Sequence, residues 1–270
     1  MRVGIVKGAF APLLRSQLMD ILHMRKQYGL QEVWFVLDDV HAINYVHRLK
    51  MLKMMIRPYR KLKIVDKKLC SGIDFVQLPY TDVPFSYISC WNDMSNCVKT
   101  YMMECGIYIK DIARCLVKTS RWKHVTSMTS CAIDIARSHR INEYEAFLAG
   151  MLHDCTKMWD SEYSAYWMRF CAPEKVDEAF AIHHQYTGAS FVKRVLKVRN
   201  KNVIQAILHH VKGDLDKPLA QIIYLADKLD PSRDYDSSKE IELAKKDLNL
   251  AVKLVKEQQE AYLRKEGVIQ

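Results

Sequence analysis

The sequence has no apolar run approaching the roughly 20 residues of a membrane-spanning helix, so we expect no membrane partner. The initial segment MRVGIVKGAF holds a short apolar stretch, broken by Lys7, and lacks the small-residue pattern of a signal-peptide cleavage site. We therefore expect a cytoplasmic protein. The 270 residues are 49% hydrophobic and contain no internal repeat or low-complexity segment, so two modest domains with packed cores are expected.

Close pairs of cysteines are also missing. The eight cysteines include no CxxC pair and none of the close spacings of a zinc site. This scatter favours free thiols in a reducing compartment. Cys155 lies beside a motif of metal-ligand residue types, yet we predict that it is a small buried hydrophobic side chain and not a nucleophile.

Positive charge is in excess, with a formal net charge of +10 and its densest run, RPYRKLKIVDKK, at residues 57–68. This run lacks the interleaved aromatic residues of a platform for single-stranded nucleic acid, so we interpret it as a solvated surface and expect no nucleic-acid partner. Small nucleotides are also polyanions, and they suit the same charge.

The first third of the sequence alternates between short apolar runs and segments with helical periodicity. Strands are predicted at 2–8, 32–39 and 61–66, and helices at 13–29 and 47–56. A strand, helix, strand order of this kind predicts an α/β domain with a parallel sheet.

From about Asn96, Gly and Pro become rare and helical periodicity runs nearly to the end of the sequence. The predicted helices cover residues 96–108, 109–117, 123–139, 143–159, 176–197, 202–211, 218–231 and 240–267. We therefore predict an all-α domain at 107–270, preceded by the α/β domain at 1–106.

Residue types that bind metals recur along the predicted helices, at His124, His153, Asp154, His184, His210 and Asp227. His153 and Asp154 follow the apolar stretch AFLAGML, and Asp227 follows IIYLA. Taken singly, each residue is more often an ordinary core, capping or salt-bridge residue. A buried, unpaired carboxylate costs several kcal/mol, however, so a buried Asp is expected to be paired or to bind a metal.

The donor set narrows the choice of metal. Imidazole nitrogens and carboxylate oxygens together suit iron, manganese or zinc better than calcium or magnesium. Four His and two Asp are enough for two ions that share ligands.

The order of these six residues resembles that of the HD-domain metal-dependent phosphohydrolases. The segments RWKHVTSMTSCAIDIA, AFLAGMLHDCTK, HQYTGASFV, AILHHVKG and IIYLADKLDPSRDYD are similar to successive segments of the bacterial symmetrical diadenosine tetraphosphatases, over most of residues 107–255. The resemblance implies hydrolysis of dinucleoside tetraphosphate to two nucleoside diphosphates by a metal-activated hydroxide. It also implies two divalent or trivalent metal ions, with iron expected and manganese or zinc compatible.

The resemblance further implies roles for individual residues. The six residues would be the metal ligands, and Asp154 would be catalytic by bridging the two ions. Lys157, one turn further on, is a candidate for a catalytic and substrate-binding phosphate contact, and Arg233 could clamp a phosphate with its guanidinium. Lys212 stands in HHVKG where the family commonly has Thr-Thr-Gly, and could add charge for the substrate.

Two histidine doublets leave a choice open, because His183 and His209 directly precede the proposed ligands. We prefer His184 and His210, from the alignment of Gly188 and Gly213 with the family.

The N-terminal segment VGIVKGAFAPLLRSQLMDIL resembles the start of the nicotinate-mononucleotide adenylyltransferases, in which a Gly-x-Phe-x-Pro turn is followed by two histidines. Gly8, Phe10 and Pro12 fit the turn, but Leu14 and Gln17 stand where the histidines would be. The family's Ser-Thr-x-Ile-Arg motif is absent, and about half of an ordinary transferase domain is missing between Asp66 and Pro84. We therefore expect a shortened, Rossmann-like nucleotidyltransferase-like domain without catalytic activity, followed by an all-α HD domain.

Two alternatives stay open at this point. The HD site could act on another phosphorylated nucleotide, which the altered HHVKG stretch favours. The whole chain could instead be a non-catalytic nucleotide-binding scaffold. The expected partner is a small dinucleotide if the chain is a tetraphosphatase, and another small nucleotide under either alternative. The sequence leaves the oligomeric state undetermined.

Overall fold

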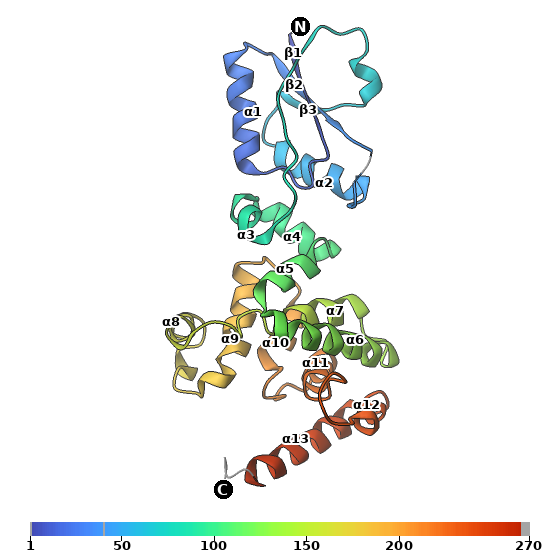
Figure 1. Cartoon of the computed structure of the whole chain (residues 1–270), viewed down its shortest axis with the longest axis vertical. Helices are drawn as coiled ribbons and strands as arrows, with labels where there is room; N and C mark the ends of the chain where they lie inside the picture. The colour runs from blue at the N-terminus through green and yellow to red at the C-terminus, as the bar shows by residue number, and fades with distance from the viewer. Residues whose placement is uncertain (1, 40, 266–270) are drawn as a thin grey trace. The chain divides into compact units, whose positions relative to one another are not determined.

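The computed structural model describes residues 2–39 and 41–265. The chain divides into two compact units (Figure 1), Met1–Tyr108 and Ile109–Gln270. We call them the N-terminal unit and the helical unit, and each is described by itself below. The predicted fold class, an α/β region followed by an all-α region, is confirmed.

A four-stranded parallel sheet forms the centre of the N-terminal unit, in the order β3-β2-β1-β4. Its strands are β1 (Val3–Gly8), β2 (Glu32–Leu37), β3 (Leu62–Ile64) and β4 (Phe75–Gln77). The first three were predicted as buried runs. The prediction missed β4, because it has three residues and an exposed or half-buried surface, which leaves no apolar run to detect.

Helices connect the strands of the sheet and follow it. They are α1 (Arg15–Gln27), α2 (Tyr45–Ile56), the short turns η1 (Lys67–Cys70), α3 (Tyr87–Cys90) and η2 (Trp91–Asp93), and finally α4 (Asn96–Cys105). Ile5, Val6, Val33 and Phe35 on the two central strands are completely buried. Lys7 is the one exposed residue of β1, and Glu32 and Trp34 of β2 are half-buried. Burial of most residues in both strands is typical of a parallel sheet that is covered on both faces.

The helical unit contains only helices and turns among its described residues. They are α5 (Ile109–Leu116), η3 (Thr119–Arg121), α6 (Trp122–Ser138), α7 (Glu143–Leu152), α8 (Ser161–Cys171), η4 (Pro173–Lys175), α9 (Phe180–Arg194), α10 (Lys201–His209), α11 (Pro218–Lys228), α12 (Ser238–Ala244) and α13 (Leu248–Lys265).

Three helix predictions were wrong in detail. Helix α7 ends at Leu152, so His153 and Asp154 lie in the turns that follow it. Helix α8 was not predicted. Only Ser164 and Met168 among its eleven residues are buried. The single helix predicted at 240–267 is two helices, and its residues 266 and 267 lie outside the described residues.

The break between α12 and α13 has a local cause. The side chain of Asp247 accepts a hydrogen bond of 3.0 Å from the backbone N–H of Leu250 at the start of α13. A carboxylate that caps the free N–H groups of a new first turn stabilises a helix start at this position.

Helix α11 is the centre of the helical unit. It packs against α6, α7, α10 and α13. Its residues from Leu219 to Asp227 are all buried, as expected for a helix that is surrounded by others. A carboxylate near its end must therefore find its partners inside the unit. Within the described residues, none of the helices combines the length and apolar character needed to cross a bilayer.

Candidate metal centre

The six residues of metal-ligand type come from five helices and meet inside the helical unit. His124 lies in the first turn of α6, His184 lies in α9, and Asp227 lies in the last turn of α11. His153 directly follows α7, with Asp154 next to it, and His210 directly follows α10. Their side chains are buried or nearly so.

Asp154 occupies the middle of this cluster. Its Oδ1 lies 3.4 Å from Nε2 of His184 and 4.0 Å from Nε2 of His210. Its Oδ2 lies 3.3 Å from Nε2 of His153 and 3.9 Å from Nε2 of His124. Two groups of possible ligand atoms therefore share Asp154, and the atoms within each group lie within 4.8 Å of one another.

Asp227 approaches the first of these groups. Its Oδ1 lies 3.3 Å from Nε2 of His124 and 4.0 Å from Nε2 of His153. Four imidazoles and one further carboxylate around the shared carboxylate of Asp154 have the composition that suits a pair of metal ions.

Two of the histidines are held in the same way by the ends of their helices. Nδ1 of His153 lies 2.7 Å from the carbonyl oxygen of Gly150, and Nδ1 of His210 lies 2.7 Å from that of Ile207. Because a carbonyl only accepts hydrogen bonds, Nδ1 carries the proton in both rings. The lone pair of a neutral ring is therefore on Nε2, which is the atom that faces the cluster.

A close contact between α6 and α7 supports the position of His153. A side chain at Gly150 would place its Cβ 2.7 Å from Oγ1 of Thr129 on α6. Only glycine allows this approach, so the Gly that precedes the His-Asp pair brings the end of α7 against α6.

His124 is oriented by a carboxylate that the sequence analysis did not identify. Its Nδ1 donates to Oδ2 of Asp230 at 2.7 Å, and Asp230 is completely buried. Asp230 also accepts from the backbone N–H and the hydroxyl of Ser232, at 3.0 and 2.6 Å. A carboxylate behind a ligating histidine is a common arrangement at metal sites. The DPS stretch directly after α11 is the only sequence signal for it.

The arrangement of lone pairs fits a cation. Nε2 of His124 and Nε2 of His153 are buried and have no hydrogen-bond partner among the described residues. With Nδ1 of His124 donating to Asp230, its Nε2 lone pair points toward Oδ1 of Asp227. Two lone pairs at this distance repel each other unless a proton or a cation lies between them, so the residues present suit a metal.

The pKa values of two histidines suit ligation as well. Burial, together with the neighbouring His210, lowers the pKa of His184 to about 2. Burial, together with the neighbouring His153, lowers the pKa of His210 to about 4. Both rings are therefore neutral near pH 7, and neutral imidazole is the form that binds metals.

The carboxylates of the cluster are ionised. Burial on its own would raise the pKa of Asp154, but the neighbouring His153 holds that pKa well below its ordinary value. In the same way, the ammonium of Lys228 outweighs burial and holds the pKa of Asp227 well below its ordinary value. Two ionised carboxylates in one buried cluster add to the negative charge that a cation would compensate.

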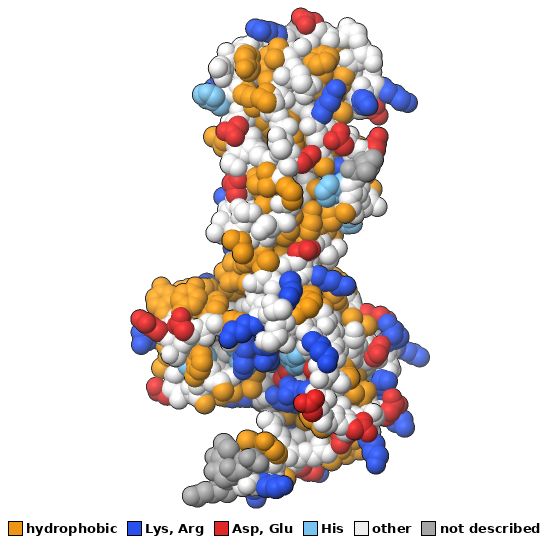
Figure 2. Space-filling model, viewed as in Figure 1, with side chains coloured by type: hydrophobic (Ala, Val, Ile, Leu, Met, Phe, Trp, Pro, Cys, Tyr) orange, Lys and Arg blue, Asp and Glu red, His pale blue; other side chains and the backbone are white. Residues whose placement is uncertain are grey.

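Basic side chains surround the cluster. The guanidinium of Arg121, which the sequence analysis did not single out, contacts Oδ2 of Asp154 through Nη2 at 2.5 Å and Nε at 2.8 Å. Nζ of Lys228 lies 3.2 Å from Oδ2 of Asp227. Arg233, which was predicted to bind substrate, donates to the carbonyl oxygen of Asp227 at 2.9 Å. Lys and Arg side chains gather over the helical unit on the face shown in Figure 2, with His side chains among them.

Lys157 lies at the cluster, but its ammonium contacts protein atoms. Nζ donates to the carbonyl oxygen of Ala181 at 3.0 Å and lies 3.2 Å from Nδ1 of His184. Burial lowers the pKa of Lys157. If the ammonium donates to Nδ1 of His184, the ring proton sits on Nε2, which is the wrong tautomer for ligation through Nε2. Metal binding by His184 therefore requires this contact with Lys157 to change.

Lys212 is engaged away from the cluster. Its ammonium lies 2.6 Å from a carboxylate oxygen of Glu178 and 5.7 Å from the ring centre of Tyr186. The structure therefore does not bring Lys212 together with the six clustered residues.

The other members of the histidine doublets have partners of their own. Nε2 of His183 lies 2.8 Å from the carbonyl oxygen of Glu178, and Nδ1 of His209 lies 2.5 Å from Oδ1 of Asp214. The structure brings His184 and His210 into the cluster instead.

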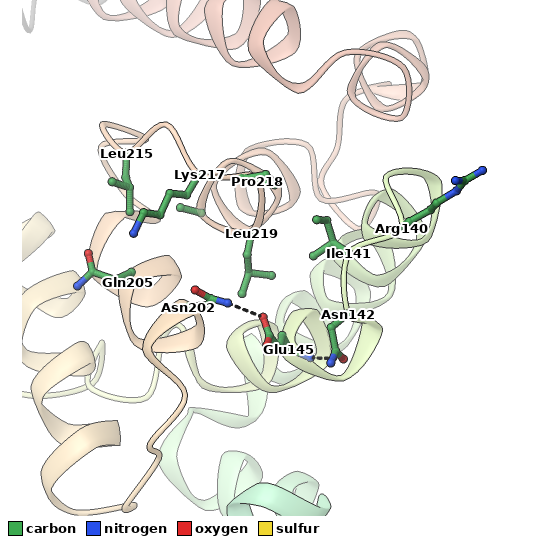
Figure 3. Close-up of a pocket in the computed structure, with 11 residues that line it drawn as sticks. Arg140, Ile141, Asn142, Glu145, Asn202, Gln205, Leu215, Lys217, Pro218 and Leu219 are labelled. Atoms are coloured by element: carbon green, nitrogen blue, oxygen red, sulfur yellow. Dashed lines mark hydrogen bonds between the residues drawn. The ribbon is translucent and has the colours of Figure 1, made fainter.

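Three pockets lie in the helical unit. A pocket of about 690 Å³ is lined in part by Lys228 and Arg233, which contact Asp227, and a second pocket of about 590 Å³ is lined in part by Lys123 and Arg233. A third pocket of about 310 Å³ (Figure 3) is lined in part by Glu145 and Asn202, which are joined by a hydrogen bond. None of the six clustered residues lines any of these three pockets.

The N-terminal turn after β1 contrasts with this cluster. Asp82 accepts hydrogen bonds from the backbone N–H groups of Ala9, at 2.7 Å, and Phe10, at 3.0 Å. The side chain of Gln17 accepts from the N–H of Leu14 at 3.0 Å and donates to the carbonyl oxygen of Thr81 at 2.9 Å. The N–H groups of the turn and the side chain of Gln17 are thus bound by other groups of the chain itself.

Comparison with known proteins identifies the helical unit. Residues 121–232 match the model of the HD domain, so this chain carries an HD domain. The chain is 24% identical over 225 residues to a Mycoplasma genitalium protein named probable nicotinate-nucleotide adenylyltransferase/Ap4A hydrolase, covering 78% of this chain and 63% of that protein. The chain therefore spans less than two thirds of that relative.

Two further matches cover roughly half of the chain each. A Halalkalibacterium halodurans protein named bis(5'-nucleosyl)-tetraphosphatase, symmetrical, is 29% identical over 140 residues, which cover 49% of this chain and 73% of that protein. The crystal structure of a predicted HD superfamily hydrolase involved in NAD metabolism, from Clostridium acetobutylicum, matches with a TM-score of 0.55 and 24% identity, over 59% of this chain and 87% of that one. This last likeness shows the fold.

Proposed function

We propose that the helical unit is a metal-dependent phosphohydrolase that cleaves dinucleoside tetraphosphates symmetrically, with diadenosine tetraphosphate as the leading substrate and two nucleoside diphosphates as products. The observation that carries the proposal is the shared carboxylate of Asp154, which joins two groups of buried ligand atoms. The HD-domain match and the names of two relatives, an Ap4A hydrolase and a symmetrical tetraphosphatase, support it.

The residues would divide the work as follows. His124, His153, Asp154, His184, His210 and Asp227 would hold two metal ions, with iron expected and manganese or zinc compatible. When bound, the ions would supply Lewis-acid stabilisation of phosphoryl oxygens and an activated water. Asp230 keeps the ring of His124 in the orientation that directs Nε2 inward.

Basic residues at the cluster would receive the tetraphosphate. Arg121, Lys228 and Arg233 each contact one of the two cluster carboxylates, so their positive charge lies where phosphate oxygens would arrive. A guanidinium can bind two phosphate oxygens at once. We propose Arg233 and Lys157 as substrate contacts, with Lys157 released from His184 on metal binding.

We also propose that the N-terminal domain predicted at residues 1–106, which lies within the N-terminal unit, is a catalytically inactive nucleotidyltransferase-like domain. The contacts of Asp82 with the turn support this, because a carboxylate already occupies the N–H groups of Ala9 and Phe10. Formation of dinucleotide from ATP and nicotinate mononucleotide by the full-length protein would contradict it. No product above the protein-free blank is expected.

Product analysis tests the proposed hydrolysis. The full-length protein, loaded with iron or manganese, is incubated with diadenosine tetraphosphate, and the nucleotides are separated by chromatography. ADP as the sole product is expected. AMP together with ATP would overturn symmetrical cleavage, and an unreacted substrate beside hydrolysis of another phosphorylated nucleotide would favour the second candidate that the altered HHVKG stretch suggests.

A metal assay separates an enzyme from a nucleotide-binding scaffold. About two metal ions per chain are expected by elemental analysis of protein purified without chelators. A metal-free protein that also fails to bind added iron, manganese or zinc would support the scaffold.

A further inference from the structure

A pocket of about 690 Å³ lies in the helical unit beside the cluster. Its wall includes the end of α11, the segment that follows it, the first turn of α12 and one side of α13, through Lys228, Arg233, Tyr235, Glu240, Gln258 and Tyr262. This volume is within the range of roughly 300–1,000 Å³ that small-molecule sites occupy. The pocket is therefore large enough for one nucleoside.

One wall of the pocket is directly connected to the cluster. Nζ of Lys228 lies 3.2 Å from Oδ2 of Asp227, and Nη2 of Arg233 lies 3.6 Å from Oδ1 of the same residue. The two cationic side chains therefore stand between the proposed metal ligands and the pocket. A phosphate chain that starts at the metal ions would pass them as it enters the pocket.

The other walls carry groups that recognise a base. The side chains of Tyr235 and Tyr262 are 52% and 62% exposed, which leaves ring surface available at the pocket. The hydroxyl of Tyr235 donates to the carbonyl oxygen of Lys228, so its ring is anchored next to the cationic wall. Exposed aromatic rings can stack on any of the nucleobases.

Polar groups complete the pocket. Nε2 of Gln258 donates to Oε1 of Glu240 at 2.9 Å, so an amide and a carboxylate lie together in the wall. The edge of adenine carries an amino donor next to a ring-nitrogen acceptor, and an amide side chain can pair with both. The pocket thus combines phosphate, stacking and base-edge contacts in one place.

We propose that this pocket is the subsite for one adenosine half of the substrate. The base stacks on Tyr262 and Tyr235, its amino edge meets Gln258 and Glu240, and the adjoining phosphates meet Arg233 and Lys228. This proposal rests on the proposed function for the identity of the complete substrate, but it predicts binding of ADP by itself.

The test compares ADP with inorganic pyrophosphate, which has the phosphates but no base. Titrations use the full-length, metal-loaded protein and its Tyr262→Ala variant. Because base stacking accounts for roughly a factor of ten or more in affinity at such platforms, ADP binding is expected to weaken about tenfold in Tyr262→Ala. Pyrophosphate binding and metal content are expected to stay the same.

Two further variants control this test. Tyr262→Phe keeps the ring and is expected to bind ADP like the unmodified protein, which separates stacking from a general change in α13. Tyr166→Ala removes an equally exposed tyrosine from α8 and is expected to leave both affinities unchanged. If Tyr262→Ala does not fold by circular dichroism, Tyr235→Ala is titrated in its place, with the same tenfold loss of ADP affinity expected.

Three results would overturn the subsite: no ADP binding to the unmodified protein, equal weakening of ADP and pyrophosphate, or unchanged ADP affinity in folded Tyr235→Ala and Tyr262→Ala. The proposed function fails separately. If diadenosine tetraphosphate is not hydrolysed but ADP binding still depends on Tyr262, the pocket stands as a nucleotide site and only the reaction is wrong.

Discussion

The turn after β1 and the cluster around Asp154 both contain groups that can bind phosphate or metal. They differ in whether those groups already have hydrogen-bond partners within the protein. In the turn, the N–H groups of Ala9 and Phe10 are taken up by Asp82. In the cluster, Nε2 of His124 and of His153 are buried without a hydrogen-bond partner within residues 2–39 and 41–265. A buried polar atom that the protein leaves unsatisfied indicates a missing ligand, whereas a self-satisfied site requires none.

The arginines of the two units differ in the same manner. Arg48 in the N-terminal unit is completely buried, and it donates to the carbonyl oxygens of Ile43, Ala9 and Asp38. Arg233 in the helical unit keeps 42% of its side chain exposed while it contacts Asp227. A guanidinium saturated by backbone carbonyls is structural, and one at an open rim can still receive a phosphate.

Replacement of Asp154 without effect would contradict this difference between the turn and the cluster most strongly. Asp154→Asn removes the ionised carboxylate shared by the two groups, so we expect loss of bound metal and a fall in kcat for diadenosine tetraphosphate on the order of 10³-fold or more. Elemental analysis and steady-state kinetics measure both. Asp134→Asn, at an exposed ion pair of α6, is the control and should change neither.

The adjacent histidines at the end of α10 allow the same contrast to be tested within one pair of neighbouring residues. His210 lies in the cluster, while Nδ1 of its neighbour His209 contacts Asp214. We expect His210→Gln to lower activity and metal affinity by on the order of 10²-fold, and His209→Gln to change them by less than about twofold. The reverse pattern would assign ligation to His209.

Removal of Asp82 tests the self-satisfied turn. Asp82→Ala leaves the N–H groups of Ala9 and Phe10 without their acceptor, so we expect the free energy of unfolding to fall by roughly 1–3 kcal/mol. Urea denaturation measures the change, and the exposed Asp74→Ala should stay within about 0.5 kcal/mol of the unmodified protein. A stable Asp82→Ala protein that gains adenylyltransferase activity would break the contrast between the two sites.

The smallest expected effect concerns the pair of Lys212 and Glu178, a self-satisfied contact within the helical unit. The hydrogen bond with Lys212 lowers the pKa of Glu178, and the hydrogen bond with Glu178 raises the pKa of Lys212. We expect Lys212→Met to cost less than about 1 kcal/mol of stability at pH 7, with little change in KM.

The pH dependence of that cost has a definite sign. The contribution from Glu178 is present above its unfolded pKa of about 4.3 and is lost as the pH falls through its lower folded pKa. The contribution from Lys212 is present below its unfolded pKa of about 10.4 and is lost as the pH rises through its higher folded pKa. Urea denaturation of both proteins at pH 3, 7 and about 11 measures both losses. A large rise in KM would instead assign Lys212 to the substrate.

Periodicity and residue type predicted the larger features of both units. Buried runs located three of the four strands, and helical periodicity located the helices that carry the cluster. It could not find β4, which has only three residues, or α8, whose aromatic residues lie partly on its exposed side, as at Tyr166 and Phe170. It also extended α7 through His153 and Asp154, since apolar residues recur after them at Cys155, Met158 and Trp159 while the backbone turns.

Within the candidate site, the sequence singled out six residues, Asp154 among them, that the structure brings together. They stood out because burial of a carboxylate or imidazole beside an apolar run costs free energy unless the group has a partner. It did not single out Arg121 or Asp230. Nothing about an Arg before α6 or an Asp after α11 is unusual in a sequence, where such residues are common at helix ends.

The sequence by itself determined the order of the elements, the division into an α/β and an all-α part, and the ligand-type residues on the helices. These follow from local patterns of burial and residue chemistry, which a linear chain displays directly. Only the tertiary structure decided which atoms meet. The contact between His124 and Asp230 joins residues 106 positions apart, and that between Ala9 and Asp82 joins residues 73 positions apart. Pairings over such separations depend on how helices and strands pack, so they determine which polar atoms are satisfied and which are left for a ligand.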